Sequence, residues 1–169
     1  RIARELTLAL RDSKEKYRMV ADFTYDWETW RQPDGNFKYV SPSCERITGH
    51  SVAEFMEDPE LLLRITHPDD RTRLTAHFGT TAQADCEPEV RMDFRLQDAQ
   101  GRLLWISHSS VVVHGENGRY LGRRESYRDI SERKQAEALL QEEYTRLEGV
   151  IEGTRAGTWE WNVQTGEVV

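Results

Sequence analysis

The sequence has few cysteines, no long apolar run and fewer basic than acidic residues, and each shortage excludes a class of protein. Only two of its 169 residues are cysteine, Cys44 and Cys86, and they lie far apart and outside any metal-binding spacing. We expect free thiols in a reducing compartment. No segment approaches the roughly 18 apolar residues that span a bilayer, and the charged start Arg1–Glu5 does not resemble a signal peptide. These features predict a cytoplasmic location without direct membrane contact, although a longer parent protein can be anchored elsewhere.

The charge balance argues against nucleic-acid binding. Acidic residues number 30 and Lys plus Arg 23, which gives a net charge of −7 that repels phosphate backbones. Hydrophobic residues make up 37% of the chain, below the roughly 45–50% of globular domains when glycine is counted. We interpret this shortfall as exposed helix outside a compact core.

Both ends of the chain have helical patterns. In residues 1–20 the spacing 4, 3, 4, 3, 4 predicts either a short coiled coil between two chains or a helix packed on its own domain. From Ser131 onward a narrow apolar stripe predicts a long amphipathic helix. We expect a homodimer through these N-terminal and linker helices. The two stripes are Ile2, Leu6, Ala9, Ser13, Lys16 and Val20, and Leu140, Tyr144, Leu147 and Ile151.

Residues 24–30 and 90–97 alternate apolar and polar residues, which predicts strands, and turn signals between the segments predict three more. Pro33–Asn36 and Asn117-Gly118 are strong turn signals. Several short helices are expected over residues 42–84, where Ser51 and Glu54 form a capping box. Because strands and helices are segregated, the pattern favours an α+β fold with a five-stranded antiparallel sheet and short helices on one face. The predicted strands are 24–30, 37–40, 90–97, 103–113 and 119–128.

Several motifs in this order resemble the PAS family of sensory domains. Tyr25–Glu28 with Tyr39–Ser43 is similar to its first two strands, and Glu45–Ser51 to the corner that follows its first short helix. His67–Asp70 resembles the start of its long central helix, and Gly122–Glu137 its closing strand and exit junction. The resemblance covers about residues 17–137. It implies a PAS fold flanked by long N- and C-terminal helices.

A weaker internal repeat occurs near the end of the chain. Trp159–Asn162 and Thr165–Val168 repeat the pattern of an aromatic strand followed by a glycine turn seen in Tyr25–Glu28 and Asp34–Phe37. The expected domains are therefore a helix over 1–20, a PAS domain over 21–130, a linker helix over 131–150 and the truncated start of a second PAS domain over 151–169. The chain opens inside a helical pattern and stops as a strand begins, so we expect it to be a segment of a longer protein. Such tandem arrays are similar to those of bacterial sensor histidine kinases and diguanylate cyclases.

The resemblance implies a relay of signal at the end of the last strand, in which the sheet is coupled to the exit helix and an effector domain in the same polypeptide. Ser131 is suited to cap that helix, and Asp129 to accept backbone amides and to pair with Arg133 or Lys134. A plain helix cap explains the same residues. The expected relay residues are Asp129, Ile130, Ser131, Arg133 and Lys134.

A small-molecule pocket is expected on the covered face of the sheet. Alternation places His108 and Ser110 on one face with Ile106, and inward polar groups there can hold a ligand or ordered water. Trp27, Trp30 and Trp105 are more simply explained by packing. The candidate ligand-binding residues are Tyr39, Phe78, Phe94, Ile106, His108 and Ser110.

No cofactor is required by the sequence. His77 lies on the helix that carries the iron ligand in haem-binding PAS relatives, but nothing else indicates a haem pocket. Cys44 lacks the sequence context of flavin photosensors. The sequence also lacks a phosphate-binding glycine loop, a catalytic triad and a metal-ligand cluster, so we expect no enzyme and no metal. The alternatives to a ligand-binding relay are a ligand-free dimerisation spacer and a haem- or flavin-bound sensor of redox state or gas.

Overall fold

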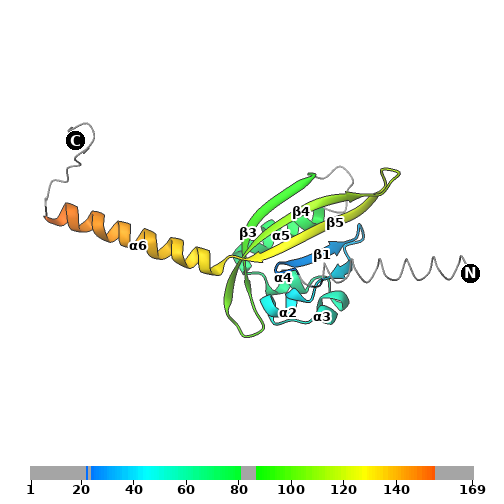
Figure 1. The fold of residues 1–169 in the computed structure, drawn as a ribbon, viewed down its shortest axis with the longest axis horizontal. Coiled ribbons are helices and arrows are strands. Elements are labelled where there is room, and N and C mark those ends of the chain that lie inside the picture. The colour runs from blue at the N-terminus through cyan, green and yellow to red at the C-terminus, as the bar shows by residue number, and fades with distance from the viewer. Residues whose placement is uncertain (1–21, 23, 81–86, 155–169) are drawn as a thin grey trace, which may run out of the picture. The chain divides into compact units, whose positions relative to one another are not determined.

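A computed structural model describes residue 22 and residues 24–80 and 87–154. Two strands come first, followed by four helices, three long strands and a final helix, as Figure 1 shows. The elements are β1 (Trp27–Arg31), β2 (Phe37–Val40), α2 (Ser43–Thr48), α3 (Val52–Glu57), α4 (Leu61–Ile65), α5 (Pro68–Thr80), β3 (Glu89–Gln97), β4 (Leu103–His114), β5 (Tyr120–Asp129) and α6 (Ser131–Thr154).

The five strands form one antiparallel sheet in the order β2-β1-β5-β4-β3. This confirms the predicted fold class. The first strand therefore lies beside the last, and helices α2 to α5 lie against one face of the sheet (Figure 1). We call this the covered face and the opposite one the outer face. Strand β1 begins at Trp27, three residues later than predicted, because Thr24 donates its hydroxyl hydrogen to the carbonyl of Asp26 in a local turn.

Local signals in the sequence define the short helices. Gly49 ends α2 in the left-handed conformation with φ 75°, which glycine adopts without strain. Ser51 and Glu54 form the predicted capping box at the start of α3. The helix beginning at Pro68 is tied to β3 because Asp70 accepts hydrogen bonds from the backbone N–H and the Nε of Arg95, both at 2.9 Å.

The core fills the space between the four helices and the covered face. Leu62, Leu74 and Phe55 project from the helices, and Phe94 and Ile106 from β3 and β4, all with 0% of their surface exposed. Removing this much apolar surface from water is the main force that holds the helices to the sheet.

One glycine fixes how closely β5 approaches β1. Gly122 has φ 107°, and a Cβ atom built on it would lie 2.0 Å from the backbone oxygen of Arg31. Only glycine fits such a contact without displacing the neighbouring strand. The same stretch contains a register shift between Trp30 and Arg31 in β1. This close approach brings the side chains of Arg31 and Arg123 to opposite positions on the covered face.

The chain divides into two compact units, residues up to Ser131 and residues from Glu132. In the second unit α6 carries exposed apolar side chains, and Arg133 and Lys134 form ion pairs with Glu137. Within the described ranges, no helix is long and apolar enough to cross a membrane. The predicted helix over residues 1–20 and the second PAS domain, apart from the end of α6, lie outside the described residues.

Candidate functional site

Polar side chains form rows across the covered face of the central strands. The register places His108 opposite Tyr127 and Ser110 opposite Glu125. It also places Thr29 opposite Glu125. Opposite residues on antiparallel strands share a face, so polar residues from three strands meet beneath the helices. We call this set the buried polar cluster: Thr29, Arg31, His77, His108, Ser110, Arg123, Glu125 and Tyr127, each no more than 7% exposed.

Glu125 lies at the centre of the cluster and is fully buried. Its Oε2 accepts hydrogen bonds from the hydroxyls of Thr29 at 2.8 Å and Tyr127 at 2.9 Å, and its Oε1 accepts one from Nε of Arg31 at 3.3 Å. Burial alone would raise the pKa of Glu125, but the charge of Arg31 and these hydrogen bonds lower it. The carboxylate therefore stays ionised inside the domain.

Two buried arginines flank this carboxylate. Arg31 lies over the rings of Phe37 and Phe78, 4.2 and 4.3 Å from their centroids, and donates to the carbonyl of Gly35. Burial would lower the pKa of Arg31, but attraction to Glu125 raises it, so the pair is ionic. Arg123 donates from Nε to the Ser110 hydroxyl at 2.6 Å. Its two Nη atoms donate to the carbonyls of Glu87 at 2.8 Å and Ser110 at 2.9 Å.

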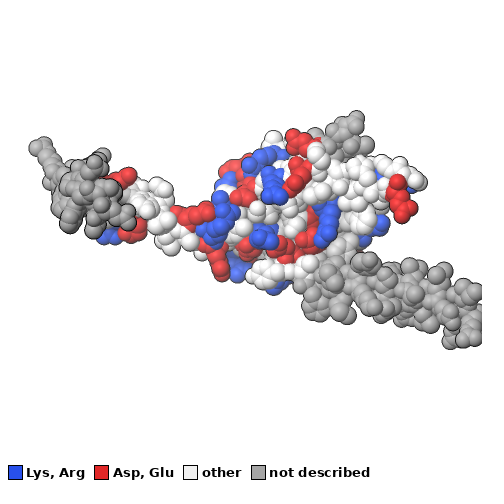
Figure 2. All heavy atoms as spheres, turned by 45° about the horizontal axis from the view of Figure 1, so that its top comes forward, with Lys and Arg blue, Asp and Glu red and all other residues white. Residues whose placement is uncertain are grey.

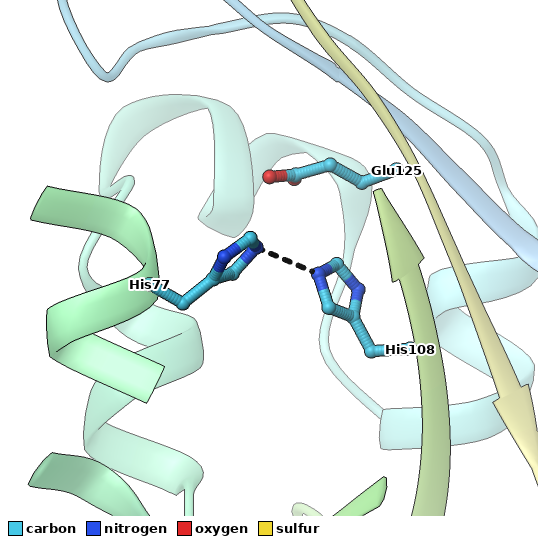
Figure 3. A group of neighbouring side chains, drawn as sticks. All are labelled: His77, His108 and Glu125. Atoms are coloured by element: carbon cyan, nitrogen blue, oxygen red, sulfur yellow. Dashed lines mark hydrogen bonds between the residues drawn. The ribbon is translucent and has the colours of Figure 1, made fainter. Parts of the chain in front are cut away.

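A histidine pair lies beside the carboxylate. His77 from α5 and His108 from β4 face each other with their Nε2 atoms 3.2 Å apart, as Figure 3 shows. His108 also stacks on Tyr127, with ring centroids 4.6 Å apart, and Tyr127 stacks on Trp27. Burial lowers the pKa of His108 to about 4 and also lowers the pKa of His77. Both rings are therefore neutral near pH 7, and one Nε2–H donates to the other Nε2.

The three side chains in Figure 3 are also a possible metal-ligand set. One ligand atom each from His77, His108 and Glu125 lie within 4.8 Å of one another. Neutral imidazole and carboxylate are the donors that Zn²⁺ accepts in open sites.

The predicted ligand-binding residues fall into two groups. Phe94, Ile106, His108 and Ser110 are buried on the covered face, which confirms the inward direction inferred from alternation. Phe78 is half-buried and contacts both His77 and Arg31. Their role in binding stays a prediction.

Tyr39 is placed apart from that group. It is opposite Trp30 in the ladder and therefore on the outer face, and its hydroxyl donates to the carboxylate of Asp22 at 2.9 Å. Tyr39 therefore does not share the covered face with the other candidates, and its role in ligand binding stays a prediction.

The predicted relay residues lie where two strands meet the start of α6. The carboxylate of Asp129 accepts a hydrogen bond from the backbone N–H of Ser131 at 2.8 Å, as expected. The hydroxyl of Ser131 accepts from the backbone N–H of Trp105 at 2.9 Å, and Ile130 donates its N–H to the carbonyl of Trp105. Asp129 thus accepts a backbone amide as expected, and Ser131 binds β4 through its hydroxyl; capping of α6 by Ser131 stays a prediction. The pairing of Asp129 with Arg133 or Lys134 stays a prediction.

Sequence reasoning missed most of the charged members of the cluster. Arg31, Arg123 and Glu125 were not singled out, and His77 was considered only as a haem ligand. Residues 123–128 carry charges at both even and odd positions, so alternation gave no signal about which face is covered. Glycine at position 122, next to Arg123, was the one hint of a close approach between strands.

The outer face is also polar and charged, but its described side chains form separate ion pairs and not one cluster like that on the covered face. Arg128 pairs with Asp26 at 2.6 Å and Arg124 with Glu28 at 3.3 Å. Figure 2 likewise shows basic and acidic side chains interspersed on the face that it presents. Such exposed pairs contribute little stability and no single-sign field. A hollow of about 210 Å³ is lined mainly by hydroxyl and charged groups, among them Ser107, Ser109 and Ser126.

The comparisons with known proteins agree with this architecture. A family model of the PAS fold matches residues 37–122, just over half of the sequence. The chain therefore belongs to the PAS fold family.

Among its relatives is the White collar 2 protein of Neurospora crassa, 28% identical over 96 residues, which are 56% of this chain and 18% of that protein. The chain spans less than a fifth of the length of the curated relatives it matches.

Similar solved structures include a sensory box histidine kinase/response regulator from Burkholderia thailandensis, with 21% identity, a TM-score of 0.57 and coverage of 79% of this chain and 98% of that one. Another is the N-terminal domain of a diguanylate cyclase with PAS/PAC sensor from Marinobacter aquaeolei, with 19% identity, a TM-score of 0.54 and coverage of 64% and 98%. At these identities the likeness establishes the fold.

Proposed function

We propose that this chain is a sensory module of a longer signalling protein, in which a change at the buried polar cluster is passed through β4 and β5 to the start of α6. The output is an effector domain in the same polypeptide, such as a histidine kinase or a diguanylate cyclase. The similarity to PAS domains of proteins with those names supports this choice of effector. The input is a small ligand bound among the cluster residues.

One structural observation carries the proposal: the same two strands hold both the cluster and the start of the helix. Strand β5 contributes Glu125 to the cluster and, four residues later, Asp129, which binds the amide of Ser131. Strand β4 contributes His108 and also Trp105, which donates to the hydroxyl of Ser131. A shift of either strand relative to the other changes hydrogen bonds at both places, because their ladder is continuous from Ile106 to Val113.

The first test uses amide hydrogen exchange and needs no knowledge of the ligand. Glu125→Gln removes the central charge of the cluster while keeping its shape. We expect faster exchange at the amides of Trp105, Ile130 and Ser131, because each donates to a hydrogen bond at the junction. Glu89→Gln, an exposed change on β3, serves as the control. Unchanged exchange at these amides in Glu125→Gln would contradict the coupling.

The second test measures output in the full-length protein. Asp129→Ala removes the acceptor of the Ser131 amide, and we expect weaker signal transfer with little change at the cluster. Glu132→Gln, the next carboxylate along the chain, is the matched control. Wild-type response in Asp129→Ala would remove the relay role from this residue.

We also propose that α6 pairs with the same helix of a second chain. Leu140, Tyr144 and Leu147 follow the heptad spacing of 4 and 3, and all are more than half exposed. Sedimentation over a range of concentrations tests the proposal. Leu147→Gln should shift the equilibrium toward monomer and Arg146→Gln should not, whereas a monomeric wild-type chain at high concentration would exclude the pairing.

We further propose that the chain itself catalyses no reaction and lies in the cytoplasm. The buried free thiol of Cys44 is consistent with a reducing compartment. The test is the absence of kinase, cyclase and hydrolase turnover in the purified chain, with the full-length protein as the positive control.

A further inference from the structure

The histidine pair and Glu125 have a geometry that a hydrogen bond alone does not require. The two Nε2 atoms face each other from α5 and β4, and the carboxylate lies next to them (Figure 3). All three ligand atoms are within 4.8 Å of one another, and none of the three residues is more than 7% exposed. Three potential ligands that converge inside a core are rarer than acidic groups that meet on a surface.

The separation of the two nitrogens matches a shared metal ion. Zn–N bonds of about 2.0–2.1 Å at a tetrahedral angle place two imidazole nitrogens about 3.3 Å apart. The observed separation of the Nε2 atoms of His77 and His108 is 3.2 Å. An ion can therefore replace the single shared proton without moving the two rings apart. The carboxylate oxygen, at up to 4.8 Å, has to approach by up to about 1.5 Å, which a rotation within the Glu125 side chain provides.

Glu125 retains the capacity to act as a ligand. An ionised carboxylate has about four acceptor positions, and the hydrogen bonds from Thr29, Tyr127 and Arg31 occupy three of them. The remaining position is on Oε1, which receives only the 3.3 Å bond from Arg31. The existing bonds to Oε2 would hold the carboxylate in place around an ion, as the supporting hydrogen bonds of metal ligands commonly do.

The protonation states of the cluster favour a cation ligand set. Both rings are buried, and the ion takes the place of the proton shared by the two Nε2 atoms, which moves to Nδ1 of the donating ring. The other ring nitrogen of His108, Nδ1, has no hydrogen-bond partner among the described residues. The backbone of Ser126 is close enough to raise the pKa of His108, so a small rotation of the ring would give Nδ1–H the acceptor that metal-bound histidines use.

The neighbouring Arg31 indicates what else the site takes. Its guanidinium lies beside the Glu125 carboxylate and favours an anionic ligand at the fourth position. The Nη2 atom of Arg31 is buried and has no hydrogen-bond partner among the described residues, so it is available to donate to such a ligand. A bound anion lowers the net positive charge of the metal, and the Glu125 carboxylate then offsets more of what remains.

From these observations we propose that His77 Nε2, His108 Nε2 and a carboxylate oxygen of Glu125 form a three-ligand site for Zn²⁺. The fourth position is open to hydroxide or a small carboxylate, which Arg31 binds. The site joins α5 to β4 and β5. The proposal concerns these side chains alone and does not depend on the signalling role proposed above.

The experiment titrates the chelator-treated chain with Co²⁺ as a spectroscopic substitute for Zn²⁺. We expect one equivalent of Co²⁺ to produce the intense visible absorption of a four- or five-coordinate ion, and Zn²⁺ to abolish it by displacement. Zn²⁺ should also raise the melting temperature, because it binds the native state only. The weak absorption of six-coordinate Co²⁺, or no saturable binding, would overturn the proposal.

Variants separate this site from the other histidines. His77→Gln and His108→Gln should each weaken Co²⁺ binding by about 100-fold or more, at least the loss seen when supporting residues of metal sites are changed. His114→Gln, at an exposed position on β4, is the matched control and should bind as the wild type does. Circular dichroism checks that the variants fold. If a variant does not fold, the Co²⁺ spectrum of the wild-type chain still tests whether a four- or five-coordinate site exists. Undiminished binding in the His77→Gln/His108→Gln double variant would assign the ion to exposed groups and overturn the proposal.

Discussion

The ion pair between Glu125 and Arg31 is the most informative place to perturb this domain. Glu125→Gln keeps the size of the side chain and its ability to accept from the Thr29 and Tyr127 hydroxyls. It removes the one carboxylate that pairs with the buried guanidinium of Arg31 within the described part of the chain. Since Arg31 is 5% exposed, water cannot replace that charge.

The expected cost follows from the burial of both partners. Removing one member of a buried ion pair leaves an uncompensated charge and costs about 3–5 kcal/mol. The rings of Phe37 and Phe78 over the guanidinium offset a part of this. In Arg31→Met/Glu125→Gln the charge is absent on both sides, so we expect the double variant to lose about 2 kcal/mol less than the sum of the two single variants.

Urea unfolding in the presence of a chelator, followed by circular dichroism, measures these free energies. Glu89→Gln is the control, because its partner Arg91 is on the surface and such pairs contribute about 0–1 kcal/mol. A Glu125→Gln variant that is no more destabilised than Glu89→Gln would refute the buried ion pair. Additive effects of the two cluster substitutions would refute it as well.

Three further outcomes are expected. Gly122→Ala should cost more than 3 kcal/mol in urea unfolding and Gly118→Ala about 1–2, because both need positive φ but only a Cβ at position 122 meets backbone at 2.0 Å; equal costs would refute the clash. Ion pairing and hydrogen bonding lower the pKa of Asp70 from 3.8, so its stabilising effect is complete well above pH 4 and is lost as the pH falls below that value. Asp70→Asn should flatten this acid limb, and a limb unchanged from wild type would contradict the assignment. Burial raises the pKa of Cys44 to about 12, so in a Cys86→Ser background iodoacetamide should modify it only after unfolding; rapid labelling of the native chain, read by mass spectrometry, would exclude a buried thiol.

Local patterns in the sequence predicted most of the fold because local rules produce it. The alternation of residues 90–97 gave β3 within one residue, and Asn117-Gly118 gave the turn between β4 and β5. Ser51 and Glu54 predicted the start of α3 since a capping box acts within a single turn. The resemblance to PAS domains then supplied the family, which the family model confirms.

The candidate site was predicted only in part. Alternation within β4 turned His108 and Ser110 inward, but it could not show what faces them. His77 comes from a helix 31 residues earlier in the chain, and Thr29 is 96 residues away from Glu125. Such contacts depend on strand order and on helix placement, and a local sequence pattern predicts neither.

The alternation of apolar and polar residues and the positions of turn residues thus determined which segments are strands, where they turn and which residues share one side of each strand. The tertiary structure alone decided that β1 lies beside β5, and therefore that Arg31 and Glu125 meet in a dry interior. The reason is physical: a residue's side of a strand is set by the backbone within two residues, whereas burial of a charge is tolerated only where distant groups arrive to pair with it.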